Sequence, residues 1–265
     1  ADVSHYVSPE SAIFREAEER ATSVYFVGKV IPMLPERLSN NICSLVPGKD
    51  RLCYSVVAEI TPGGKVTDYR IEKTVINSKR RYSYEEAQAI LDSGKGDFFA
   101  ELSMLLELSR KLRTNRIRKG SINFKSSEVK FRLDDKGSPV SIEIKHLLEA
   151  NNLIEEYMLL ANQIVAAHIK NNKKEMQYPF VYRIHDLPDK VKIDEFAVFV
   201  KTLGYSFTPG QKNDSKQLQM LLEKTAGTDE EAVINEVAIR SMAKAIYSTE
   251  NIGHFGLAFK YYTHF

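Results

Sequence analysis

The chain has 265 residues, and 43% of them are apolar, which is ample for a packed core and excludes general disorder. Its 37 basic and 35 acidic side chains leave a net charge of +2, too small to indicate a nucleic-acid binder by itself. No apolar run approaches the roughly 20 residues that a membrane helix needs. The two cysteines, Cys43 and Cys53, suit a reducing compartment. We therefore expect a soluble cytoplasmic protein without a membrane partner.

The first fifty residues predict short elements separated by loops. ADVSHYV (residues 1–7) alternates like a strand, and Ser8 and Pro9 suit the N-cap and first position of a helix. SVYF (23–26) predicts a short strand. Several prolines then break the pattern over residues 29–49, which favours loop and short helical turns.

Two hairpins and a series of helices follow. The turn TPGGK (61–65) lies between two β-rich runs, and DDKGS (134–138) separates VKFRL from VSIEI. SYEE at 83–86 fits a capping box. Helices are predicted at 83–92, 97–118, 147–171, 215–225 and 229–247, and strands at 181–186 and 254–265. The stretch 187–205 is predicted to be a strand-to-helix unit closed by Gly204. The pattern indicates one α+β domain, with mainly antiparallel strands packed with several helices.

The helix at 147–171 carries two stripes at helical spacing. The predicted buried stripe holds Leu153, Ile154, Tyr157, Met158, Ala161, Ile164 and Val165. The second, partly polar stripe holds Glu155, Leu159, Asn162 and Ala166. Glu155 and Glu156 are adjacent and diverge by about 100°, so that only one of them can point inward. Glu155 is the carboxylate without an evident structural explanation.

The common catalytic fingerprints are missing from the sequence. The six histidines show no metal-ligand spacing, and there is no G-x-S-x-G elbow, P-loop or dinucleotide motif. Local charge is more informative, because RKLRTNRIRKG (110–120) holds six cations and no anion. This run has two interpretations: cations that complement a helix C-terminus, or an electrostatic footprint for phosphate.

Four segments carry a resemblance to a known family. ADVSHYV, IPMLPERLSNNICSL, FVYRIHDLP and MAKAIYSTENIGHFGLAFKYYTHF together resemble the catalytic RNB domain of the ribonuclease II and ribonuclease R family. The form ADVSHYV is more similar to the ribonuclease R branch. The resemblance covers residues 1–265 and implies an RNB-type fold, with no complete OB or S1 module in the segment.

The resemblance also implies an activity. Family members are processive exoribonucleases that degrade single-stranded RNA from its 3′ end to nucleoside 5′-monophosphates. Two magnesium ions held by an aspartate cluster of the form D-x5-D-x-D-D serve the reaction, and arginine comes from a T-S-P-x-R-R-Y element. We expect both elements to lie outside this chain, on either side, so that the chain alone is inactive. The alternative is a non-catalytic RNA-binding or scaffold protein of the same fold.

The RNA-contacting residues are likewise implied by the resemblance. Tyr25 matches a tyrosine that stacks on the terminal nucleotide, and Phe124 matches a phenylalanine at the other end of the stack. Tyr84 matches a tyrosine near the substrate, and Glu155 matches a glutamate that contacts the 3′ nucleotide. Arg116 and Arg118, which lead into Phe124, are expected to line the path of the RNA backbone. For the aromatic residues the alternative is ordinary packing in the core.

Overall fold

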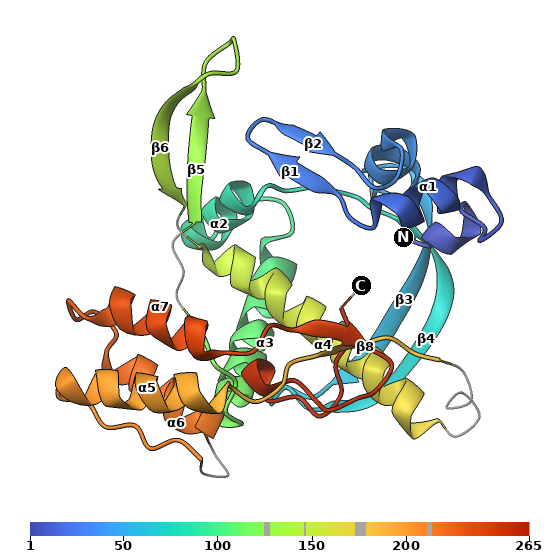
Figure 1. Ribbon diagram of the computed structural model, residues 1–265. Helices are drawn as coiled ribbons and strands as arrows, with labels where there is room; N and C mark the ends of the chain where they lie inside the picture. The colour runs from blue at the N-terminus through green and yellow to red at the C-terminus, as the bar shows by residue number, and fades with distance from the viewer. Residues whose placement is uncertain (125–127, 146, 173–178, 211–213, 265) are drawn as a thin grey trace. The chain divides into compact units, whose positions relative to one another are not determined.

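The structure is a computed structural model that describes residues 1–124, 128–145, 147–172, 179–210 and 214–264 (Figure 1). The chain forms two compact units. Unit 1 comprises residues 1–59, 66–96 and 127–148, and unit 2 comprises residues 60–65, 97–126 and 149–265. The helices and antiparallel pairs agree with the predicted α+β class.

Unit 1 consists mainly of β-hairpins (Figure 1). Strands β1 and β2 are antiparallel, with Tyr25 opposite Val30. Strands β3 and β4 pair as the TPGGK turn predicted, and β5 and β6 form the second predicted hairpin. The elements of unit 1 are η1 (Val3–His5), α1 (Ala12–Arg20), β1 (Val24–Phe26), β2 (Lys29–Ile31), the π-helix η2 (Arg37–Ile42), β3 (Asp50–Ile60), β4 (Val66–Asn77), α2 (Tyr84–Ser93), β5 (Glu128–Leu133) and β6 (Pro139–Lys145).

Helix starts in unit 1 follow side-chain caps. The predicted capping box is confirmed at α2, where the Ser83 hydroxyl accepts from the Glu86 N–H and the Glu86 carboxylate accepts from the Ser83 N–H. The predicted start of α1 was wrong, because Ser11 rather than Ser8 accepts the capping bond, from Phe14. A side-chain cap therefore decided the boundary in both helices.

The N-terminal segment is not the predicted strand. Residues Val3–His5 form a 3₁₀ turn, because the buried Asp2 carboxylate accepts hydrogen bonds from the Ser4 hydroxyl at 2.6 Å and the His5 N–H at 3.3 Å. Lys73 Nζ lies 3.5 Å from the same carboxylate. The Ser4 hydrogen bond, and to a smaller extent Lys73, lower the pKa of Asp2.

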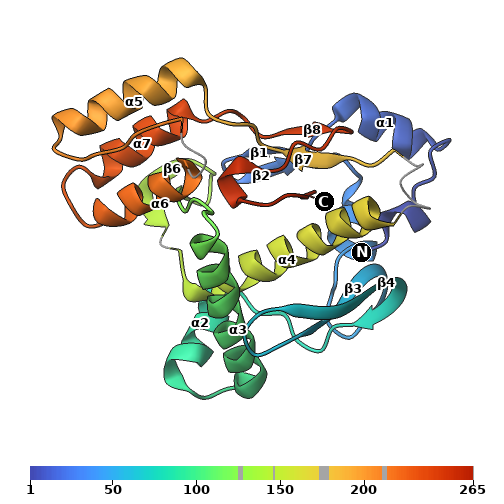
Figure 2. The same cartoon turned by 90° about the horizontal axis from the view of Figure 1, so that it is seen from below.

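Unit 2 contains the largest apolar core that the described residues form. Helices α5, α6 and α7 lie together in Figures 1 and 2, and their apolar sides pack around Phe196, Leu218 and Ile234, which are almost fully buried. Helices α3 and α4 pack against each other. The elements of unit 2 are α3 (Phe99–Arg118), α4 (Glu149–Asn171), β7 (Tyr182–Ile184), α5 (Lys190–Thr202), α6 (Asp214–Lys224), α7 (Glu231–Ser241), β8 (Ile246–Ser248) and η4 (Phe255–Leu257).

The C-terminal segment also differs from the predicted strand. Residues Phe255–Leu257 form a 3₁₀ turn, which ends at Ala258 in the left-handed conformation with φ +53°. Beyond the turn the chain runs beside β7, where the Tyr262 carbonyl accepts from the Arg183 N–H at 2.9 Å. The aromatic alternation suggested a strand, but the 3₁₀ turn and the left-handed conformation of Ala258 turn the backbone away from one.

The buried side of α4 matches the apolar stripe that the sequence predicted only in part: Leu153 and Ile164 are buried. Ile154 and Met158 are about half exposed, whereas three members of the second stripe, Leu159, Asn162 and Ala166, are buried. Its polar members have partners: Asn162 donates to the Tyr262 hydroxyl at 3.4 Å. The hydrophobic periodicity did not predict the burial of Asn162, because it leaves out polar side chains whose hydrogen bonds are satisfied.

A buried ion pair joins α3 to α4. Arg116 and Glu156 are 6% and 3% exposed, and the guanidinium lies 2.5 Å from the carboxylate. Arg116 Nη1 also donates to the Ser121 hydroxyl at 2.6 Å. The expectation that Arg116 faces the RNA backbone is therefore not met in this structure, because its guanidinium is enclosed by protein partners. Of the two adjacent glutamates, Glu156 points inward, and the side chain of Glu155 is 49% exposed.

Removing the inward carboxylate should destabilise unit 2. Glu156→Gln leaves the Arg116 charge buried without its main counter-ion, and we expect a loss of about 3 kcal/mol in the free energy of unfolding. Glu155→Gln is the matched control, and we expect a loss below about 1 kcal/mol because its carboxylate is solvated. Urea unfolding followed by circular dichroism measures both. Equal losses would contradict the assignment of Glu156 as the principal partner.

Candidate nucleic-acid interface

Phe124 lines a large cavity within unit 2. The cavity has a volume of about 1360 Å³, and its walls come from the N-terminal part of α5, the end of α7 and the segment after β7. Phe124 and Phe199 supply partly exposed aromatic surface. The charged side chains of the lining are three cations and three carboxylates: Lys192, Arg240, Lys244, Asp186, Asp189 and Glu195. Aromatic rings beside cations suit a nucleotide chain, because bases stack on rings and phosphates attract ammonium groups.

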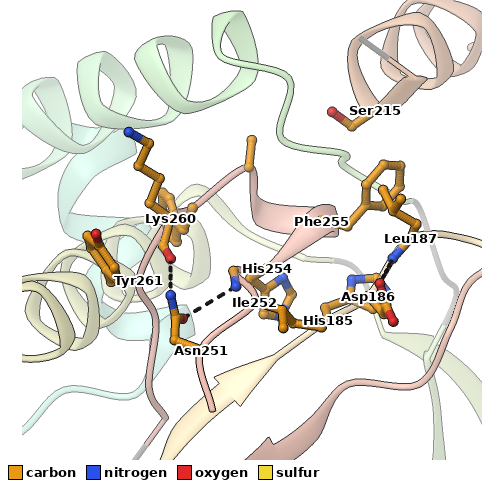
Figure 3. A pocket seen from close by; sticks show the side chains of 13 residues that line it. His185, Asp186, Leu187, Ser215, Asn251, Ile252, His254, Phe255, Lys260 and Tyr261 are labelled. Carbon is orange, nitrogen blue, oxygen red and sulfur yellow. Dashed lines mark hydrogen bonds between the residues drawn. The ribbon is translucent and has the colours of Figure 1, made fainter. Parts of the chain in front are cut away.

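A second cavity of about 470 Å³ adjoins the first, and the two share residues 185–187 and His254. Figure 3 shows how Asn251 closes part of its wall. The Asn251 amide donates to the Lys260 carbonyl at 2.9 Å and accepts from the Gly253 N–H at 3.4 Å. The wall is thus formed by the segment that leads into and out of the η4 turn.

His185 lies between the cavities and holds that segment. Its Nδ1 accepts from the Gly256 N–H at 3.0 Å, so its Nε2 carries the proton and donates to the Ala243 carbonyl at 2.8 Å. A Cβ on Gly256 would lie 3.0 Å from the same Nδ1, tighter than ordinary packing allows. Glycine at 256 therefore permits the close approach of ring and backbone.

His254 packs edge-on against His185, with the ring centroids 5.0 Å apart. Its Nδ1 accepts from the Leu257 N–H at 3.2 Å and so caps the η4 turn. Burial lowers the pKa of His254 to about 4, and the neighbouring His185 acts in the same direction. Burial also lowers the pKa of His185. Both rings are thus neutral at pH 7 and serve as hydrogen-bonding groups.

The other sequence-predicted residues lie on both units. In unit 1, Tyr25 on β1 is 77% exposed, and Tyr84 at the first position of α2 is 43% exposed. Packing in the core, the alternative for Tyr25, does not describe a ring so exposed. In unit 2, the Glu155 carboxylate lies 3.5 Å from Arg116 Nη2. Contact of these residues with RNA stays a prediction.

Arg118 lines a third cavity, of about 350 Å³, in unit 2. Two other cations in its lining, Arg110 and Lys111, are paired with Glu149 and Glu107 at 2.8 and 2.6 Å. Within the described ranges, Arg118 makes no ion pair, and its side chain is exposed. Arg118 is therefore the cation of this cavity that is best placed to meet a phosphate.

Sequence reasoning overlooked the histidines and Gly256. His185 and His254 are far apart in the chain and match no ligand spacing, so nothing in the sequence joined them. A weak signal existed, because RIHDLP and IGHFGL both lie in the segments that carry the family resemblance. Only the fold, which sets His185 beside His254, shows that they act together.

Two searches of the part of the chain that the structure describes gave negative results. Its His, Cys, Asp and Glu side chains form no group of three or more that could hold a metal ion. None of its helices combines the length and apolar character needed to cross a membrane.

Comparison with known proteins decides the family. The model of the RNB domain matches residues 1–265. The chain belongs to the RNB family. Ribonuclease R 1 of Lactococcus lactis is 40% identical over 273 aligned residues, which include the whole chain and 33% of the relative. The chain thus spans about a third of the length of this RNB relative.

Two solved structures have the same fold as this chain. Mycoplasma genitalium RNase R in complex with ribose-methylated single-stranded RNA superposes with a TM-score of 0.91 and 29% identity, over 100% of this chain and 42% of that one. Yeast Ssd1, described as a pseudonuclease, has a TM-score of 0.76 at 21% identity, over 100% of this chain and 32% of that one. The second match shows the fold alone.

Acid should destabilise unit 2 through His254. Its folded-state pKa of about 4 lies below the ordinary value of 6.5, so the unfolded chain binds more protons between these values. The stability contributed by the neutral ring is present above pH 6.5 and is lost as the pH falls from 6.5 towards 4. Thermal unfolding at pH 7 and pH 5 measures the loss.

The variant His254→Asn tests the assignment, because its side-chain oxygen can accept the Leu257 N–H without titrating. We expect a smaller acid-induced fall in the unfolding temperature than in the wild type. His168→Asn, which removes an imidazole on α4 outside both cavities, is the control. An undiminished fall in His254→Asn would contradict the role assigned to this ring.

Proposed function

We propose that this chain forms part of an exoribonuclease that degrades single-stranded RNA processively from its 3′ end and releases nucleoside 5′-monophosphates. The observation that supports this most is the match of the RNB domain along all 265 residues, together with 40% identity to a ribonuclease R. The RNA complex of the Mycoplasma relative supports RNA as the ligand.

Base stacking supplies the main contact in this proposal. Tyr25 stacks on the terminal nucleotide, and Phe124 stacks on a base further from the 3′ end. Each stacked base contributes about 1–3 kcal/mol whatever its identity, because every base has a π-face. Tyr84 lies near the substrate, and Glu155 contacts the 3′ nucleotide. A site of this kind tolerates any sequence, as a degrading enzyme requires.

The catalytic groups belong, in this proposal, to parts of the protein outside residues 1–265. Magnesium is the expected cofactor, but the described residues provide no group of three ligands to hold it. The aspartate cluster and the arginine element that the resemblance implies are expected to supply this chemistry. The chain alone therefore binds RNA without cutting it. We place the enzyme in the cytoplasm.

The direction of degradation can be measured on the complete protein that contains this chain. With magnesium, an oligoadenylate labelled at its 3′ nucleotide should release labelled mononucleotide at once, while a 5′ label appears only in a short end product. Residues 1–265 alone should release neither label. Early release of the 5′ label would overturn the proposed direction, and release by the isolated chain would show that it contains the catalytic groups.

Arg118 should contribute a phosphate contact. Arg118→Ala should weaken RNA binding at low salt and reduce the slope of log affinity against log salt by about 0.7, the value for one phosphate of a single strand. Arg20→Ala is the control, because this exposed arginine of α1 is paired with Glu16 at 2.7 Å. Fluorescence anisotropy across a salt series measures the slope. A slope equal to that of the wild type would reject the contact.

The alternative function is a non-catalytic RNA-binding or scaffold protein. One observation favours it: yeast Ssd1, described as a pseudonuclease, shares the fold, so that the fold alone does not establish catalysis. The labelling experiment separates the two functions. Tight RNA binding by the complete protein, with neither label released in magnesium, would favour the alternative.

A further inference from the structure

The backbone immediately before Phe124 is held by two elements that are distant in sequence. The Ile122 N–H donates to the Gly256 carbonyl at 2.8 Å. The next N–H, that of Asn123, donates to the side-chain oxygen of Gln219 at 2.7 Å. Two successive amides are therefore fixed by partners from η4 and α6, and Phe124 is the next residue.

Gln219 occupies a position on α6 that would suit an apolar residue. It is 6% exposed and lies beside Leu218 and near Leu222, which belong to the core of α5, α6 and α7. A buried amide is unfavourable in such a place unless both of its ends are satisfied. The hydrogen-bond partners of the Gln219 amide therefore indicate the role of this side chain.

Both ends of the Gln219 amide are satisfied. Its nitrogen donates to the Glu223 carboxylate, one helical turn further on, at 2.9 Å. A carboxylate accepts only from the NH₂ end of the amide, so Glu223 turns the oxygen of Gln219 towards the Asn123 N–H. Glu223 therefore sets the orientation, and Gln219 holds the backbone.

The same core supports both the holding residue and the held segment. Ile122 is 7% exposed and is a member of the cluster that includes Leu218 and Phe196, and Phe124 packs against this cluster. The ring of Phe124 also lines the 1360 Å³ cavity. A displacement of the backbone at Asn123 therefore moves the ring at the cavity wall.

We infer that Gln219 is a positioning residue, which fixes Phe124 for stacking on an RNA base through the backbone of Asn123. The inference rests on the proposed function, because Phe124 must contact RNA for its position to matter. Gln219 itself touches no RNA in this arrangement. Replacement of Gln219 should therefore change RNA binding only by moving the ring of Phe124.

A double-mutant cycle on the complete protein tests this dependence. The measured quantity is the dissociation constant for fluorescent oligoadenylate, with EDTA present to prevent cleavage. Phe124→Ala should weaken binding roughly 5- to 150-fold, the equivalent of one lost stack. Gln219→Leu, which keeps the helix and the burial but removes the acceptor, should weaken binding at least threefold. In the Phe124→Ala background, Gln219→Leu should have no further effect.

Exchanging the side chains of residues 219 and 223 should restore RNA binding. In Gln219→Glu combined with Glu223→Gln, the residue at 219 still accepts from Asn123, the residue at 223 donates to it, and the net charge is unchanged. Binding should return to within twofold of the wild type. Met220→Ala, at an exposed position of the same helix, is the control, and melting temperatures of all variants verify folding.

The outcomes separate a failure of the inference about Gln219 from a failure of the proposed stacking function on which it rests. Full binding by Phe124→Ala would overturn the stacking function and the inference with it. Weak binding by Phe124→Ala but unchanged binding by Gln219→Leu would overturn the inference alone. The inference alone would also be overturned if Gln219→Leu weakened RNA binding equally in the wild type and in Phe124→Ala. The effect of Gln219 would then not pass through the ring of Phe124.

Discussion

The buried ion pair between Arg116 and Glu156 is the constraint on which the rest of unit 2 depends. Burying two charges costs desolvation that their attraction offsets only in part, so the pair does more to define one arrangement than to add stability. From Arg116 the contacts continue to the Ser121 hydroxyl, which reaches the Gly256 carbonyl at 3.3 Å. Gly256 in turn is bound by His185. Helices α3 and α4, the η4 turn and β7 are therefore tied together by polar groups.

This chain of polar contacts leads to the residue on which the proposed function relies. Gly256 also accepts from Ile122, two residues before Phe124, so the ring at the cavity wall is placed by the same contacts that hold the helices. The two histidines contribute as neutral hydrogen-bonding groups. Unit 2 thus has a cavity with an aromatic residue on a fixed backbone, which suits stacking of successive bases without regard to sequence.

Local signals in the sequence predicted much of this fold. The capping box at Ser83 and the two turn motifs were correct because their geometry is set by neighbours in sequence. The strands expected at both ends were wrong, because an Asp2 cap at one end and the 3₁₀ turn that ends at Ala258 at the other override the alternation. The predicted face of α4 was correct only in part, because Glu156 and Asn162 are also buried, with partners on other elements. Tertiary hydrogen bonds of this kind leave no periodic trace in a sequence.

The candidate site likewise contains residues that the sequence indicated and residues that only the structure revealed. Resemblance supplied Tyr25, Tyr84, Phe124 and Glu155, and the basic run supplied Arg118. Three further residues emerged only from contacts across more than fifty residues of sequence: Gln219, His185 and Gly256. The correction at Arg116 shows the limit of local charge, since a cation in a basic run can be wholly committed to a buried partner.

Photocrosslinking tests the central claim, that RNA stacks on this chain with its 3′ end at Tyr25, most directly. Oligoadenylates that carry one 5-iodouridine at a defined position are irradiated with the complete protein in EDTA, and the modified residue is found by mass spectrometry. The account predicts a crosslink to Tyr25 from the 3′-terminal position and to Phe124 from a position further from the 3′ end. Crosslinks to neither ring, or to both only from the 5′ end, would contradict it.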